Sequence, residues 1–176
     1  MGACRVYRLA LLLCAAAAAA QSPKYRLGRT PTPEEIRQWD FSARSDGKGL
    51  PAGSGSAALG KEIFTNRCSK CHGSAGQGGD AAPLVGGRGT LNTAKPLKTV
   101  ESYWPYATTV FDYVKRAMPF NQPGTLTNDQ VYAVTAYVLF LAKIVPEKSV
   151  LDAHSLAQIR MPNRDGFVPD PRPDVK

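Results

Sequence analysis

The chain has 176 residues, with 22 Lys and Arg against 14 Asp and Glu, and its formal net charge is +8 at pH 7. This length corresponds to one domain, and the positive charge favours an acidic protein partner. The sequence has no Lys/Arg run and no alternation of basic and aromatic residues, so it does not indicate nucleic-acid binding.

The first twenty residues have the pattern of a cleavable export signal. Arg5 and Arg8 precede an apolar stretch from Leu9 to Ala20, whose last alanines provide a small-residue cleavage site. The alternative is a membrane anchor, but the stretch is shorter than the roughly 20 residues of a spanning helix. We therefore expect a periplasmic mature chain without a transmembrane segment.

Residues 21–55 predict an irregular extension, because prolines, glycines and charged residues dominate them. One short helix is expected from Pro33 to Trp39. Proline suits the first position of a helix, and Glu34 and Glu35 suit its positive N-terminal end.

A longer helix is predicted from Ser56, which is a typical N-cap residue. Leu59, Gly60, Ile63 and Phe64 follow at helical spacing and form an apolar stripe. This helix leads into the motif that carries most of the chemical information in the chain.

That motif is Cys68-Ser69-Lys70-Cys71-His72, a C-x-x-C-H sequence typical of covalent c-type haem attachment. Two thiols one helical turn apart can bind both vinyl groups of one porphyrin edge, and His72 then faces the iron. A zinc site would need a second Cys or His pair, and a thioredoxin-like redox pair would need a βαβ context. A disulfide would leave His72 unexplained.

Two further helices follow a glycine-rich loop at 73–89. The first is predicted from about Pro105 to Ala117, and Pro119 ends it. The second begins with a capping box, in which Thr127 is the cap and Gln130 its partner, and runs to about Val145. It is apolar on most sides, so it should be buried.

The fold class predicted is all-α with long loops, because no strand alternation is seen. The expected organisation is a signal peptide at 1–20, an irregular N-terminal extension at 21–55, a haem-binding domain at 56–145 and an irregular C-terminal extension at 146–176.

Three side chains after the signal are strong candidates for the sixth iron ligand: Met118, Met161 and His154. Met118 lies at a predicted helix end before Pro119, which frees the chain from helical geometry. It is also compatible with an ordinary core methionine. With haem bound we favour His72 and Met118 as the iron ligands, and a thioether ligand raises the reduction potential relative to two histidines.

Residues 56–145 resemble a class I cytochrome c in their order of helix, haem motif, glycine-rich loop, helix, methionine and final helix. The resemblance implies three to four helices around one covalent haem c. It also implies that the first and last helices cross at Gly60 and Tyr137. The carbonyl of Pro83 is expected to accept a hydrogen bond from His72 and fix its ring.

Haem propionates need hydrogen-bond donors, and Arg88, Tyr103 and Trp104 are the residues expected to provide them. The alternative is a solvated arginine beside core or surface aromatic residues.

A narrower resemblance covers most of the chain after the signal. The chain is similar to the SoxD and sulfite dehydrogenase cytochrome subunit family. Some members of that family carry two haems, whereas one attachment motif here predicts one haem. The segments that carry the resemblance are 32–36, 46–51, 53–56, 102–109, 116–120 and 160–167.

This resemblance implies an electron carrier that is not an enzyme on its own. It would accept electrons from a molybdenum-containing dehydrogenase subunit that acts on sulfite or sulfane sulfur, and pass them to another cytochrome c or an oxidase. The two extensions would be arms on that subunit, or else disordered tails. The alternatives are a free soluble electron shuttle, and a haem enzyme or gas sensor with an open iron site.

Overall fold

The computed structural model describes residues 27–172, so the predicted signal at 1–20 lies outside the described residues. The chain divides into two units, Met1–Asp40 and Phe41–Lys176. The described part of the first unit contains helix α2 (Pro33–Trp39), as predicted. Its capping box begins at Thr32, whose hydroxyl accepts a hydrogen bond from the amide of Glu35.

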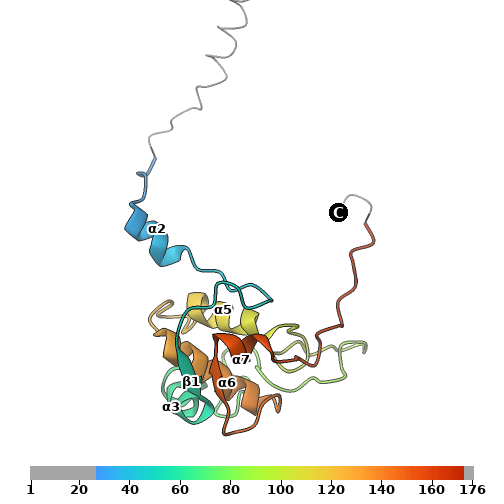
Figure 1. The fold of residues 1–176 in the computed structure, drawn as a ribbon. Coiled ribbons are helices and arrows are strands. Elements are labelled where there is room, and N and C mark those ends of the chain that lie inside the picture. Colours follow the sequence, from blue (N-terminus) through green and yellow to red (C-terminus); the bar gives the residue numbers. More distant parts are fainter. Residues whose placement is uncertain (1–26, 173–176) are drawn as a thin grey trace, which may run out of the picture. The chain divides into compact units, whose positions relative to one another are not determined.

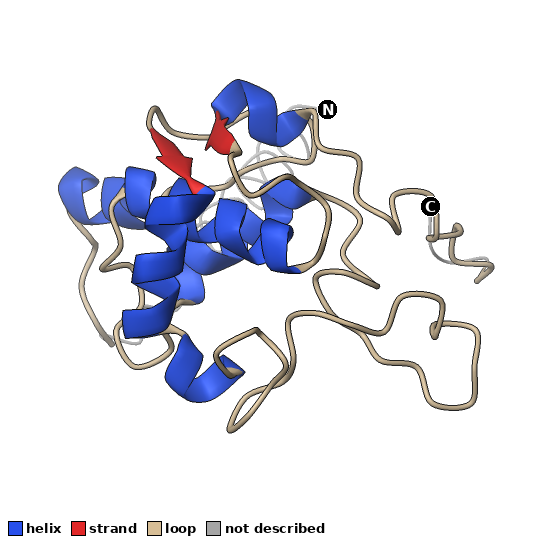
Figure 2. Cartoon of the chain, turned by 90° about the horizontal axis from the view of Figure 1, so that it is seen from below, coloured by secondary structure: helices blue, strands red, loops and turns tan. Residues whose placement is uncertain are grey.

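The second unit is mostly helical, which confirms the predicted fold class (Figures 1 and 2). Its helices are joined by long loops, and a short two-stranded sheet packs against α6. The elements are β1 (Ser54–Ser56), α3 (Ala57–Arg67), α4 (Ser69–His72), α5 (Ala107–Ala117), α6 (Asn128–Leu141), β2 (Val150–Asp152) and α7 (Ala153–Ala157).

Helix α6 forms the centre of the core. Residues 131–139 are all buried, as their apolar pattern predicted. The predicted capping box is also present, since the Thr127 hydroxyl accepts from the amide of Gln130 and the Gln130 side chain accepts from the amide of Thr127. Because so much of the core lies on α6, the other helices pack around this helix.

Two helix boundaries differ from the prediction. Helix α5 begins at Ala107 rather than near Pro105, and α6 ends at Leu141 rather than near Val145. After α6 the chain turns tightly, and Lys143 adopts a φ of 56°. Apolar residues continue through this turn, so hydrophobic pattern alone extends the predicted helix too far.

Helices α3 and α6 cross at Gly60, as predicted from the resemblance. A Cβ atom at Gly60 would overlap the carbonyl oxygen of Ala133 and approach the Cβ of Tyr137 to 2.8 Å. Next to the crossing, the rings of Phe64 and Tyr137 meet edge to face with centroids 5.4 Å apart. Only glycine lets the two backbones approach this closely.

The flanking segments are more regular than the sequence indicated. Strand β1 pairs antiparallel with β2, with Gly55 opposite Leu151, and α7 follows β2 directly. Each strand has three residues. This length is too short to produce a recognisable alternation, so the pairing of two distant segments was not predictable from either one.

Hydrogen bonds and aromatic contacts attach residues 41–52 to the helices. The amide of Ala43 donates to the buried carboxylate of Asp112 at 2.8 Å, and the hydroxyl of Tyr132 donates to the carbonyl of Pro51 at 2.8 Å. The ring of Phe41 lies 6.1 Å from that of Phe111. This part of the predicted extension therefore belongs to the packed unit. Within residues 27–172, no helix has the length and apolar character needed to cross a membrane.

Candidate haem-binding site

The attachment motif forms its own short helix. Helix α3 ends at Arg67, Cys68 breaks the helical backbone with φ −124° and ψ −37°, and α4 then covers Ser69–His72. The prediction placed the motif at the end of the preceding helix, and the break at Cys68 is the difference. It turns the chain so that the amides of Cys71 and His72 both donate to the Cys68 carbonyl, at 3.1 and 3.0 Å.

Both thiols of the motif are free. Cys71 is exposed and Cys68 is half-buried. Burial raises the pKa of the Cys68 thiol to about 11, although neighbouring Arg67 acts in the opposite direction. Because both thiols are free and at least partly exposed, both can form thioether bonds with a group that covers this surface.

The imidazole of His72 is held by one hydrogen bond. Its Nδ1 atom lies 2.9 Å from the carbonyl oxygen of Ala82. A carbonyl can only accept, so Nδ1 carries the hydrogen and Nε2 keeps a free lone pair. This is the tautomer that a metal ligand needs.

The acceptor predicted for this bond, the carbonyl of Pro83, is wrong by one residue. The loop returns to the motif through the amide of Ala81, which donates to the Cys71 carbonyl at 2.9 Å. This contact brings the Ala82 carbonyl, in the peptide that precedes Pro83, to the imidazole. The proline thus follows the acceptor and does not provide it.

The three candidates for the sixth iron ligand lie in different surroundings. Met118 is the C-cap residue of α5 and is partly exposed. Met161 is only 1% exposed and belongs to the hydrophobic core. His154 is exposed on α7. Ligation by Met118 stays a prediction, and the burial of Met161 gives that side chain a packing role.

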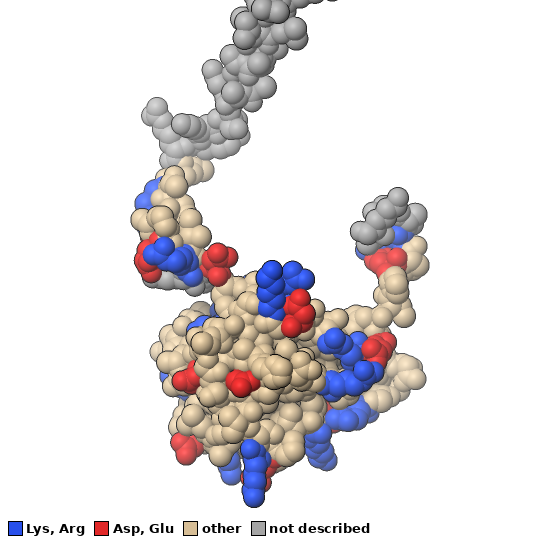
Figure 3. Space-filling view, in the orientation of Figure 1, with Lys and Arg blue, Asp and Glu red and all other residues tan. Residues whose placement is uncertain are grey.

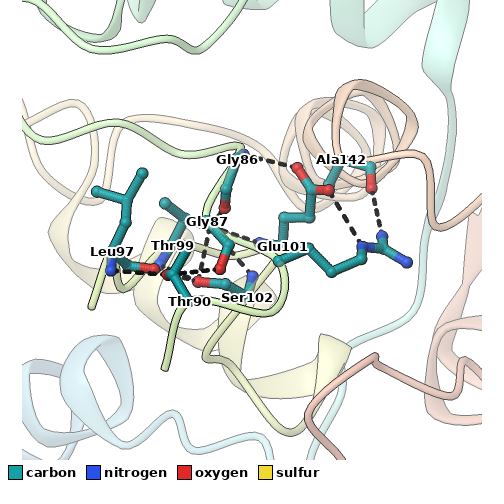
Figure 4. Close-up of polar contacts among 9 residues, drawn as sticks. Gly86, Gly87, Thr90, Leu97, Thr99, Glu101, Ser102 and Ala142 are labelled. Carbon is teal, nitrogen blue, oxygen red and sulfur yellow. Dashed lines mark hydrogen bonds and ion pairs between the residues drawn. The ribbon is translucent and has the colours of Figure 1, made fainter. Parts of the chain in front are cut away.

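Arg88 is held by a polar network that includes Glu101 and Ala142, both labelled in Figure 4. Its Nε donates to Glu101 at 3.2 Å and its Nη2 donates to the carbonyl of Ala142 at 3.1 Å. The other oxygen of Glu101 accepts from the amide of Gly86 at 2.6 Å. Arg88 therefore fastens the glycine-rich loop to α6 in this structure.

The two aromatic residues grouped with Arg88 have other contacts. Trp104 packs edge to face against Tyr113 with ring centroids 5.7 Å apart, and Tyr103 packs likewise against Phe167 at 5.3 Å. No hydrogen bond joins Arg88 to either residue among the described contacts. Propionate binding by these three side chains stays a prediction.

A surface hollow of about 280 Å³ lies beside Arg88. Lys143 and Arg160 also line it, but Arg88 and Arg160 are paired with Glu101 and Asp165. On the face that Figure 3 shows, basic side chains also lie among acidic ones. These pairings neutralise most of the positive charge around the hollow.

The donor set fits a covalently attached haem. Two free thiols precede an imidazole whose Nε2 is available, and all three lie within one short turn. Residues 27–172 contain no group of three or more His, Cys, Asp or Glu side chains that could hold a metal ion directly. The zinc alternative therefore lacks a ligand set in the described part of the chain.

Comparison with known proteins identifies the family. A model of the family "Cytochrome c" matches residues 57–142. The sulfane dehydrogenase SoxCD from Paracoccus pantotrophus contains a chain with 45% sequence identity and a TM-score of 0.77, and the match covers 85% of this chain and 74% of that one. The chain belongs to the cytochrome c family. Within SoxCD it resembles the cytochrome subunit, SoxD.

A second relative is thiosulfate dehydrogenase of Stutzerimonas stutzeri (strain A1501), which is 28% identical over 93 residues. The match covers 50% of this cytochrome but only 28% of the relative's length. These findings confirm the family, the fold, the electron-transfer function and the covalent haem c that the C-x-x-C-H motif predicted.

Proposed function

We propose that this cytochrome carries one haem c and is the electron-accepting subunit of a periplasmic, molybdenum-dependent dehydrogenase that acts on sulfite or sulfane sulfur. The observation that carries the proposal is the likeness to the SoxD chain of SoxCD, at 45% identity over 85% of this chain. Such a match extends beyond residues 57–142, which the general cytochrome c family model covers. It therefore includes flanking segments that a generic cytochrome does not share.

The residues of the motif have distinct tasks in this function. Cys68 and Cys71 would hold the haem by thioether bonds, and His72 would bind its iron through Nε2 while Ala82 keeps the ring oriented. Met118 would supply the sixth ligand and so close the iron to substrates. Bound haem supplies a one-electron ferric/ferrous couple. The protein contributes the ligands, an apolar shell and a docking surface.

The N-terminal unit is the segment best suited to contact a large subunit. Its described residues 27–40 are a separate unit from Phe41 onward, and they expose Leu27 (88%) and Ile36 (50%). Residues 41–56, by contrast, pack on the cytochrome itself. Of the two arms expected from the sequence, the N-terminal arm therefore reduces to the part before Phe41.

The direct test is affinity purification of the haem-loaded protein from its native periplasm, with a molybdenum assay and identification of bound chains. A stoichiometric molybdenum subunit that reduces the haem when its sulfur substrate is added is the expected result. Isolation of the cytochrome alone under mild salt would contradict the proposal and favour a free electron shuttle.

A matched variant makes this test sharper. Deleting residues 27–40 removes the described part of the first unit without touching the segment that packs on α5 and α6. We expect the variant to keep the haem spectrum of the intact protein and to lose most of the bound molybdenum subunit. Undiminished copurification would assign the contact to the second unit.

A further inference from the structure

One side chain connects the haem-attachment segment to the loop that carries Met118. Arg67 is the last residue of α3 and directly precedes Cys68. Its Nη2 donates to the side-chain oxygen of Gln122 at 3.1 Å and to the hydroxyl of Thr125 at 3.0 Å. These partners are 55 and 58 residues away in sequence. The guanidinium thus directly joins two segments that are far apart in sequence.

The loop from Met118 to Leu126 is fastened at both ends by other contacts. The amide of Met118 donates to the Val114 carbonyl at 3.1 Å, which caps α5. The ammonium of Lys115 donates to the Leu126 carbonyl at 3.1 Å, where Leu126 is buried before α6. Both contacts tie the loop to its own neighbours in sequence, so neither fixes its position relative to the haem motif.

Hydrogen bonds within the loop hold Gln122 and Thr125, the two residues that accept from Arg67. The amide of Gln122 donates to the Pro119 carbonyl at 2.8 Å, and the Thr125 hydroxyl donates to the Gln122 carbonyl at 2.8 Å. A hydroxyl that donates in one bond can still accept in another. Among the described hydrogen bonds, those of Arg67 are the ones that join residues 57–72 to this loop.

We propose that Arg67 is a positioning residue for the sixth ligand: its two hydrogen bonds hold the Met118 loop in register with His72. The inference rests on the proposed ligation by Met118. A methionine ligand leaves the iron whenever its loop moves away, so the equilibrium between bound and displaced methionine includes the cost of breaking these bonds. The three side chains involved are exposed, so a modest cost is expected.

The probe is imidazole, which competes with methionine for ferric iron. The variant Arg67→Met removes the donors and keeps a side chain of similar length. It should bind imidazole about fivefold more tightly than the wild type, as follows from a loss of about 1 kcal/mol in two exposed hydrogen bonds. When the pH is raised, the variant should also lose the methionine–iron charge-transfer absorption of the ferric haem at a lower pH than the wild type does.

Two further variants separate position from charge. Arg67→Lys keeps the charge and a single donor group, so it should recover part of the wild-type imidazole affinity. Lys61→Met removes a positive charge from the same helix without a described side-chain bond to the loop, so it should bind imidazole like the wild type. If Lys61→Met matches Arg67→Met, charge explains the effect and the positioning role is overturned.

Thr125→Val keeps the inference testable if Arg67→Met does not take up haem. It removes one acceptor of Arg67, so it should tighten imidazole binding by a smaller factor. In the Arg67→Met background its effect should be smaller still, because only the bond from the Thr125 hydroxyl to the Gln122 carbonyl is then lost. A wild-type ferric spectrum without the methionine–iron absorption would overturn Met118 ligation and this inference together. A wild-type spectrum with that absorption, combined with unchanged imidazole affinity in Arg67→Met and Thr125→Val, would overturn the role of Arg67 alone.

Discussion

The helical domain at 57–142 and the segments on either side of it are built by different means. In the domain, α3 and α6 have local start signals, the Ser56 cap and the Thr127 capping box. In the flanks, the structure depends on partners far away in sequence, such as Gly55 opposite Leu151 in the sheet. Both kinds of region nevertheless contact the same helix, because α6 touches α3 on the one hand and β1 on the other.

This difference shows that the folded cytochrome unit extends beyond the helical domain at 57–142. The flanks pack on the helices through the buried carboxylate of Asp112, the hydroxyl of Tyr132 and the buried side chain of Met161. Contacts of this kind give the flanks a share in the stability of the unit.

The largest effect is expected from comparing the methionine of the domain with that of the C-terminal flank. Replacing Met118 by Ala should abolish the methionine–iron absorption. It should also shift the reduction potential by a sizeable part of the roughly 0.8 V range that axial ligands control. Replacing the core residue Met161 by Leu should leave both unchanged and cost less than about 1.5 kcal/mol of stability. Visible spectroscopy and redox titration of both variants decide between them, and the reverse outcome would move the ligand into the flank.

Two glycines allow a direct comparison of domain and flank in stability. A Cβ atom at Gly60 would overlap the Ala133 carbonyl oxygen, and one at Gly55 would overlap the Ala133 amide nitrogen. Because backbone atoms cannot move aside, Gly60→Ala and Gly55→Ala should each lower the free energy of unfolding by about 3 kcal/mol. Urea unfolding of the haem-loaded proteins provides the measurement.

Gly89→Ala is the control for these two variants. Gly89 has φ +78° but no atom within 4 Å of an added Cβ, so it should lose about 1 kcal/mol from backbone strain alone. If Gly55→Ala loses little free energy of unfolding and Gly60→Ala loses much, the flank adjusts to an added Cβ atom whereas the domain does not.

The contact between Tyr132 and Pro51 gives a pH-dependent measure of the same attachment. Burial, aided by the nearby carboxylate of Asp152, raises the pKa of Tyr132 to about 12 from its ordinary value near 10. Between these values the unfolded chain loses the proton while the folded chain keeps it. The stability that this tyrosine contributes is therefore intact below pH 10 and falls as the pH rises to 12.

Tyr132→Phe isolates this contribution. At neutral pH the variant should be about 1 kcal/mol less stable, because it lacks the hydrogen bond to the Pro51 carbonyl. Between pH 10 and 12 the wild type should lose stability relative to the variant, which has no phenol to ionise. Urea unfolding of both proteins across this range is the measurement, and parallel pH profiles would contradict a buried, bonded tyrosine.

The residues that sequence predicted well are those whose chemistry is encoded locally. The C-x-x-C-H motif, the caps at Ser56 and Thr127 and the buried face of α6 all follow from spacing within one segment. The acceptor at Ala82 was missed by one residue, because the turn that selects it depends on backbone bonds between the loop and the motif. The hydrogen-bond partners of Arg67 and Arg88 were missed for the same reason, because the sequence of neither segment indicates that the other lies beside it.

The smallest effect concerns two buried threonines of the domain. The hydroxyl of Thr135 has no hydrogen-bond partner within the described residues, whereas that of Thr99 donates to the Gly86 carbonyl at 2.7 Å. Thr135→Val should therefore raise the free energy of unfolding by up to about 1 kcal/mol, and Thr99→Val should lower it by about 1–2 kcal/mol. Thermal unfolding of the haem-loaded variants distinguishes these opposite signs. A loss of stability in Thr135→Val would mean that its hydroxyl is bonded in the loaded protein, and the middle of α6 would then take part in more than packing.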